Sequence, residues 1–73
     1  MISKKALKVI NEELNSYTVA LQMYDDAKGD DSKSLWASCG LKALEALDVY
    51  GIKPSAGSEV MRNLWQSAIR IAA

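Results

Sequence analysis

Carboxylates are the side chains of this sequence whose type and spacing come nearest to a ligand-binding cluster. Four of them surround one glycine: Asp25, Asp26, Asp30 and Asp31. Ca²⁺ prefers such oxygen ligands, but an EF-hand loop with Gly29 at its sixth position would have Tyr24 first and Lys28 fifth, where carboxylates are required. We therefore expect a solvated turn with helix-capping aspartates at this point, and no metal site.

Nucleophilic catalysis is the second chemistry to consider, and the sequence contains no histidine and a single cysteine, Cys39. A serine or cysteine nucleophile normally needs an imidazole base to accept its proton. Cys39 stands among apolar neighbours in the middle of a predicted helix, which predicts a buried structural thiol. The residues therefore predict a chain that is not an enzyme and that has no cofactor and no small-molecule substrate.

The charges of the chain balance, with nine basic and nine acidic residues among its 73. A neutral chain lacks the basic footprint of a general nucleic-acid binder. The distribution is uneven, because Lys4, Lys5 and Lys8 make the start basic and aspartates make the first connection acidic. The sequence shows no apolar segment long enough to cross a bilayer, no signal peptide and no second cysteine, which together predict a cytoplasmic protein.

The longest periodic apolar pattern lies in the first third of the chain, with alternating steps of three and four residues: Leu7, Ile10, Leu14, Tyr17, Leu21 and Tyr24. This spacing predicts one helix over about residues 3–27, with Ser3 as its cap. A further row on one edge holds Ile2, Val9 and Met23. The apolar face is therefore wider than a two-stranded coiled coil requires, and a helix in a bundle needs such a width.

Two more helices are predicted, over about residues 32–50 and 56–72, the last beginning at Ser55 or Ser58. Asp30, Asp31 or Ser32 is expected to cap the second helix, and Gly51, Ile52 and Pro54 to end it. Their expected inner faces hold Leu35, Trp36, Cys39, Gly40, Ala43, Leu44, Ala46, Leu47 and Tyr50, then Met61, Leu64, Trp65, Ala68 and Ala72. The sequence thus predicts that residues 1–73 form a single all-α domain, a small antiparallel three-helix bundle with a long first helix.

Residues 51–60 resemble the turn and early recognition helix of bacterial helix-turn-helix repressors. The matching positions are Gly51, Ile52, Pro54, Ser55, Ser58 and Val60. The segment departs from that pattern at Leu47, Gly57 and Glu59, where the family usually has alanine, a buried aliphatic residue and a polar or basic residue. The resemblance implies major-groove contacts from Ser55, Ala56, Ser58, Arg62 and Asn63. An ordinary turn also needs glycine and proline for backbone reasons, so it stays the alternative.

We expect a non-catalytic module that binds another protein, or a second copy as a homodimer paired along the first helix. Small neutral helical chains of this kind are often accessory or inhibitor proteins of phages and other mobile elements. Trp36 is expected in the core, and Trp65 as a partly exposed anchor. The predicted contact residues are Val9, Met23, Arg62, Trp65 and Ile69. The alternative is DNA binding through residues 51–63.

Overall fold

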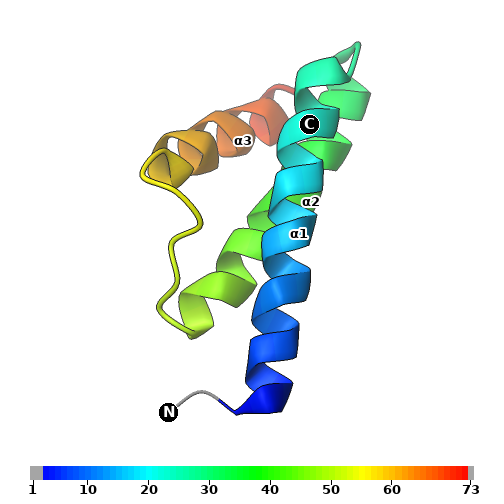
Figure 1. The fold of residues 1–73 in the computed structure, drawn as a ribbon. Helices are drawn as coiled ribbons and strands as arrows, with labels where there is room; N and C mark the ends of the chain where they lie inside the picture. The colour runs from blue at the N-terminus through cyan, green and yellow to red at the C-terminus, as the bar shows by residue number, and fades with distance from the viewer. Residues whose placement is uncertain (1–2, 73) are drawn as a thin grey trace.

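The computed structural model describes residues 3–72, which fold into three helices: α1 (Lys4–Asp26), α2 (Asp30–Val49) and α3 (Ser58–Ala72). α1 and α2 form an antiparallel hairpin, and α3 runs obliquely beside the half of the hairpin that contains its turn (Figure 1). The predicted all-α three-helix bundle is confirmed. α1 is continuous and is the longest helix, with 23 residues against 20 and 15. Ile2, predicted to extend the row of Val9 and Met23, lies outside the described residues.

The two ends of α1 are held by one predicted and one unpredicted contact. The hydroxyl of Ser3 accepts a hydrogen bond from the Ala6 N–H at 3.1 Å, so the predicted cap is confirmed. At the other end, Lys33 of α2 donates from its Nζ to the carbonyl of Tyr24 at 3.2 Å. The last carbonyls of a helix lack intrahelical partners and carry partial negative charge. Lys33 therefore stabilises the end of α1 and ties it to α2.

The turn between α1 and α2 is tighter than predicted, because Gly29 has a φ of +87°, in the left-handed region that favours glycine. Gly29 is itself the residue before the first turn of α2, and no side chain caps that helix. The prediction that Asp30, Asp31 or Ser32 is the cap is therefore wrong. The glycine reverses the chain so sharply that Asp30 and Asp31 already lie in the first turn of α2, where their charge complements the helix dipole.

The end of α2 follows the predicted signal. Gly51 has a φ of +69°, and its N–H donates to the Asp48 carbonyl at 3.0 Å. The next N–H, from Ile52, donates to the Leu47 carbonyl at 3.0 Å. This pair of bonds is a Schellman motif, which satisfies carbonyls that would otherwise be unpaired. Residues 50–57 then lead to α3, which begins at the second of the two predicted positions, Ser58.

The core is centred on Trp65 of α3, which has no exposed surface. Its ring lies edge to face with Tyr17 at 5.6 Å between centroids and with Tyr24 at 6.3 Å. Its indole N–H has no acceptor among residues 3–72. Trp36 is only half-buried, so the expected places of the two tryptophans were wrong and are reversed. The buried cluster around Trp65 consists of Tyr17, Ala20, Ala37, Ala43 and Leu44.

Gly40 explains why Trp65 takes the central place. A Cβ at this position would come within 3.0 Å of three carbons of the Trp65 ring, so the indole lies directly on the backbone of α2. Ala37 and Ala43 lie three residues before and after Gly40 in α2, and both are fully buried. These three small residues form the seat of Trp65. Within the described residues, no Cα of α1 lies within 8 Å of a Cα of α3. The aromatic rings of Trp65, Tyr17 and Tyr24 therefore connect these two helices across a wide separation.

The buried face of α2 is rotated relative to the predicted one, toward Ala37. Four residues predicted to face inward are exposed: Leu35, Cys39, Tyr50 and, on α3, Leu64. The prediction of a buried structural Cys39 is therefore wrong. The buried face is rotated because Ala37 and Gly40 must face α3 to accept the indole of Trp65. Leu35, which lies on another side of α2, then faces solvent.

The seat of Trp65 predicts opposite outcomes for two glycine substitutions. Gly40→Ala should lower the free energy of unfolding by about 1–3 kcal/mol, because overpacking against the indole outweighs the better helix propensity of alanine. Gly57→Ala is the matched control, since a Cβ there meets nothing within 4 Å. Gly57 directly precedes α3, where glycine is a better capping residue than alanine, and this loss opposes the gain from a less flexible unfolded chain, so stability should change by less than about 1 kcal/mol. Denaturant unfolding followed by circular dichroism measures both, and a Gly40→Ala protein as stable as the control would contradict the packing described.

Candidate functional site

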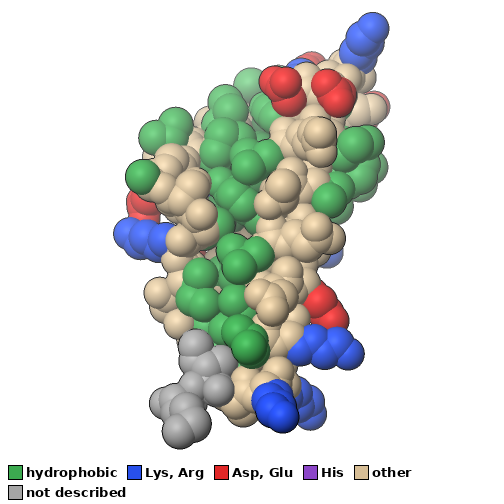
Figure 2. All heavy atoms as spheres, in the orientation of Figure 1, with side chains coloured by type: hydrophobic (Ala, Val, Ile, Leu, Met, Phe, Trp, Pro, Cys, Tyr) green, Lys and Arg blue, Asp and Glu red, His purple; other side chains and the backbone are tan. Residues whose placement is uncertain are grey.

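The separation of α1 from α3 leaves an open, mostly apolar groove between them, the α1–α3 groove. It has a volume of about 530 Å³ and is lined by Thr18, Leu21, Gln22, Tyr24, Asp25, Met61 and Leu64. Hydrophobic side chains gather along this face of the molecule (Figure 2). The groove exists because aromatic side chains, and not close backbones, join the two helices.

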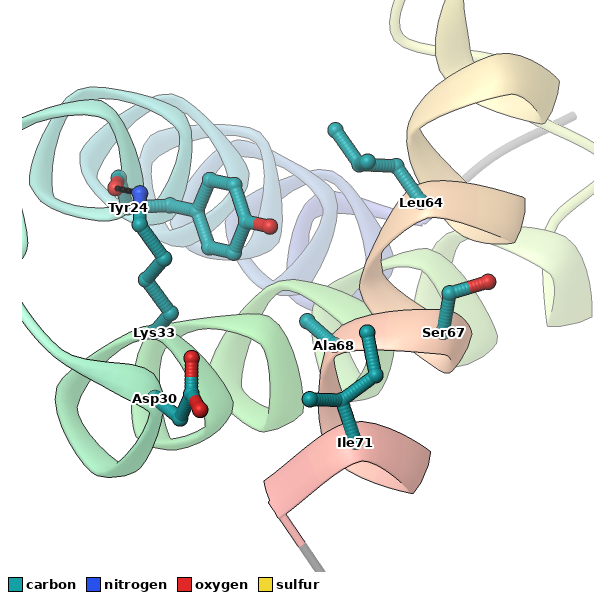
Figure 3. Close-up of a pocket in the computed structure, with 7 residues that line it drawn as sticks. All are labelled: Tyr24, Asp30, Lys33, Leu64, Ser67, Ala68 and Ile71. Carbon is teal, nitrogen blue, oxygen red and sulfur yellow. Dashed lines mark hydrogen bonds between the residues drawn. The ribbon is translucent and has the colours of Figure 1, made fainter.

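A smaller pocket of about 120 Å³ adjoins the groove at the end near the α1–α2 turn. It is lined by Tyr24, Asp30, Lys33, Leu64, Ser67, Ala68 and Ile71 (Figure 3). Tyr24 and Leu64 line both hollows, so the two form one continuous surface. In Figure 3 the ring of Tyr24 projects from α1 toward α3, and Lys33 reaches it from α2. The Nζ of Lys33 lies 4.6 Å from the centroid of that ring, in cation–π geometry that helps to fix it.

Only one charged side chain of residues 3–72, that of Asp25, is among those that line the groove. Asp25 and Asp30 are exposed at one end. Arg62 lies outside the lining and donates to Asp48 of α2 at 2.7 Å. The hydrogen bond that Arg62 donates to the Asp48 carboxylate is the main cause that raises the pKa of Arg62 above its usual value. Arg62 therefore stays charged at any ordinary pH, and its guanidinium is paired with a carboxylate of the same chain.

The predicted contact residues do not form one surface. None of Val9, Met23, Arg62, Trp65 and Ile69 lines the groove or its adjoining pocket. Trp65 as a partly exposed anchor is wrong, since the ring is fully buried. Ile69 is half-buried against the core, and Val9 is half-buried on α1. Met23 is 40% exposed, so its role as a contact residue stays a prediction.

Sequence reasoning considered Asp25 and Asp30 only as turn or capping residues and missed the other polar side chains that line the two hollows: Thr18, Gln22, Lys33 and Ser67. Their apolar neighbours did carry a signal, because Leu7, Leu14 and Leu21 recur at a spacing of seven residues along one row of α1. What the sequence did not show is that α3 stands opposite the end of that row and places Met61 and Leu64 against Leu21.

The segment that resembles a helix-turn-helix motif has a different shape from that motif. Helix-turn-helix units join their helices by a turn of three or four residues, whereas α2 and α3 are joined by residues 50–57. Ser55 and Ala56 precede α3, so the recognition positions assigned to them are not helical. Arg62, another of those positions, is paired with Asp48. DNA binding through residues 51–63 stays a prediction without a supporting contact.

Metal sites and membrane spans are two further features that residues 3–72 could contain. This part of the chain places no three of its cysteine, aspartate and glutamate residues where they could hold a metal ion together. Over the same residues, no helix combines the length and the apolar character needed to span a membrane. Comparisons with protein-family models, with curated protein sequences and with solved structures found no match. The α1–α3 groove is therefore the feature on which the proposed function rests.

Two substitutions on α3 should separate the core from the surface. Trp65→Ala should lower the free energy of unfolding by about 3–5 kcal/mol, which equals the whole stability expected of so small a core. Arg62→Ala should cost less than about 1 kcal/mol, because its ion pair with Asp48 is exposed to solvent. Thermal unfolding followed by circular dichroism distinguishes them. A Trp65→Ala protein that still unfolds cooperatively near the wild-type temperature would show that the indole is not the centre of the core.

Proposed function

We propose that this protein is a non-catalytic interaction module that accepts a helix, from another protein or from a second copy, in the α1–α3 groove. The observation that carries the proposal is the apolar surface along the groove. Leu64 on its wall is 46% exposed, Ile71 in the adjoining pocket is 71% exposed, and Leu7 on the same row of α1 as Leu21 is 51% exposed. Exposed apolar side chains that gather on one face typically mark a site of protein association.

The shape of the groove suits a helical ligand. Two helices form its walls, and an amphipathic helix can lay its apolar face along such a channel. Each large apolar side chain that becomes fully buried on binding contributes about 1.5–3 kcal/mol. The chain itself has little further capacity to cover these residues, because a domain of about this length buries only about 60% of its unfolded surface.

The groove also offers little that could act on a bound molecule. Thr18 carries the aliphatic hydroxyl of the groove lining, but its Oγ1 donates to the Leu14 carbonyl at 2.9 Å. A hydroxyl held by its own helix backbone is poorly placed to attack a substrate. Together with the absence of histidine from the sequence, this supports binding as the role of the groove.

Affinity capture from the native cell tests the proposal with three forms of the chain. Leu64→Lys places a charge on the groove wall, while Val49→Lys places the same charge on α2 outside the groove, at a residue that is 80% exposed. We expect a protein partner, which can be the chain itself, to be retained by the wild type and by Val49→Lys and to be lost by Leu64→Lys.

Circular dichroism must first show that both variants fold like the wild type. Equal retention by all three forms would contradict the proposal. A retained nucleic acid whose binding falls steeply with salt and depends on Arg62 would instead indicate the DNA-binding alternative.

A further inference from the structure

The charges of α1 are arranged against its own helix dipole. Lys4 and Lys5 occupy the first turn, and Asp25 and Asp26 occupy the last. The first turn of a helix carries partial positive charge and the last turn partial negative charge, so each of these side chains is on the unfavourable end. Local preferences are usually violated where a residue serves a function beyond the stability of its own element. The polarity of α1 therefore requires an explanation outside the isolated helix.

Two neighbouring rows of α1 show what that explanation is. One row holds the leucines at positions seven apart, and the row beside it holds exposed residues with the same spacing: Lys4, Asn11, Thr18 and Asp25. Residues seven apart lie almost in line on a helix, since about 3.6 residues make one turn. Read from one end, the polar row is basic, then neutral, then acidic. Read from the other end, the order of charges is reversed. Two such rows paired antiparallel therefore place the basic residue of each beside the acidic residue of the other.

We propose that the occupant of the α1–α3 groove is α1 of a second copy of this chain, paired antiparallel about a two-fold axis at Leu14. In this arrangement Leu14 lies opposite its own equivalent, and Leu7 of each copy lies opposite Leu21 of the other. On the neighbouring row, Lys4 lies within about one residue's rise of Asp25 of the second copy, close enough for their side chains to pair. A two-fold interface of this kind requires a surface that is complementary to itself, which the two rows provide. The inference rests on the proposed function, because it names the partner of the same groove.

The groove lies at the end of α1 where this pairing places Leu7 of the second copy. Leu21 lies on its wall beside Met61 and Leu64, whereas Leu7 lies at the other end of α1, which α3 does not reach, and is 51% exposed (Figure 1). The antiparallel copy brings its Leu7 to the end of α1 that has the groove. The two-fold symmetry covers Leu7 of both copies at once. α1 spans about 34 Å at roughly 1.5 Å per residue, so the two helices overlap along nearly their whole length.

Charge favours this orientation over the parallel one. Lysines gather at the lower end of α1 and acidic side chains near its upper end (Figure 2). The ion pairs within residues 3–72 are Lys53 with Glu59 and Arg62 with Asp48, which leaves the terminal charges of α1 available to a partner. Antiparallel pairing places each lysine cluster beside the aspartates and the negative helix end of the other copy. Parallel pairing would bring lysine against lysine and aspartate against aspartate.

Charge reversal with sedimentation equilibrium tests the pairing on the full chain. The wild type should be a dimer at micromolar concentration. Lys4→Glu and Asp25→Lys should each raise the dimer dissociation constant about tenfold or more, because each change acts twice across the two-fold axis. The double variant should restore dimerisation. Both single changes improve the match to the helix dipole, so a weaker dimer cannot be attributed to a less stable monomer.

Cross-linking determines the register independently. In a Cys39→Ser background, Leu14→Cys should be linked to itself by a short bismaleimide, Leu7→Cys alone should not, and Leu7→Cys mixed with Leu21→Cys should be. Self-linking of Leu7→Cys, or a dimer insensitive to charge reversal, would overturn the pairing. A strictly monomeric chain would also overturn it. Capture of another protein that is lost only with Leu64→Lys would then still support the proposed function, which separates the two failures.

Discussion

The contact between the indole of Trp65 and the backbone at Gly40 is the constraint on which the arrangement of all three helices depends. It brings α3 close to α2, while Tyr17 and Tyr24 reach the same ring from α1. One side chain thus joins three helices, although the backbones of α1 and α3 stay apart. The α1–α3 groove follows from this arrangement, because the rings connect α1 and α3 without bringing their backbones together.

Features of the fold that depend on neighbouring residues were predictable. The helix start at Ser3 and the Schellman motif at Gly51 are local backbone chemistry, and the sequence shows both. The face that α2 buries was not predictable in the same way, since it depends on where a side chain from α3 lands. Gly40 was the available signal, because glycine in a helix interior costs about 1 kcal/mol and is often explained by close packing. The exchange of roles between Trp36 and Trp65 follows from this one missed contact.

The candidate site was predictable only on the side of α1. The leucine row, the excess of apolar surface and the opposed charges at the two ends are all visible as spacing along one helix. The opposite wall comes from Met61 and Leu64, about forty residues further along the chain, and their position is decided by how Trp65 is seated. A candidate residue chosen for its chemical type alone, such as Arg62, can therefore be paired within the chain, as Arg62 is with Asp48.

The order of the helices has a consequence for how the chain folds. Close backbone approaches occur between α1 and α2 and between α2 and α3, which are consecutive in the sequence. Contact order is therefore low, and helical proteins of low contact order fold in microseconds to milliseconds. The α1–α2 hairpin can form from its own residues, and docking of the single indole completes the core. A chain built in this way reaches its native state rapidly, so the side chains of its core, such as Trp65, Leu44 and Leu47, spend little time exposed to solvent.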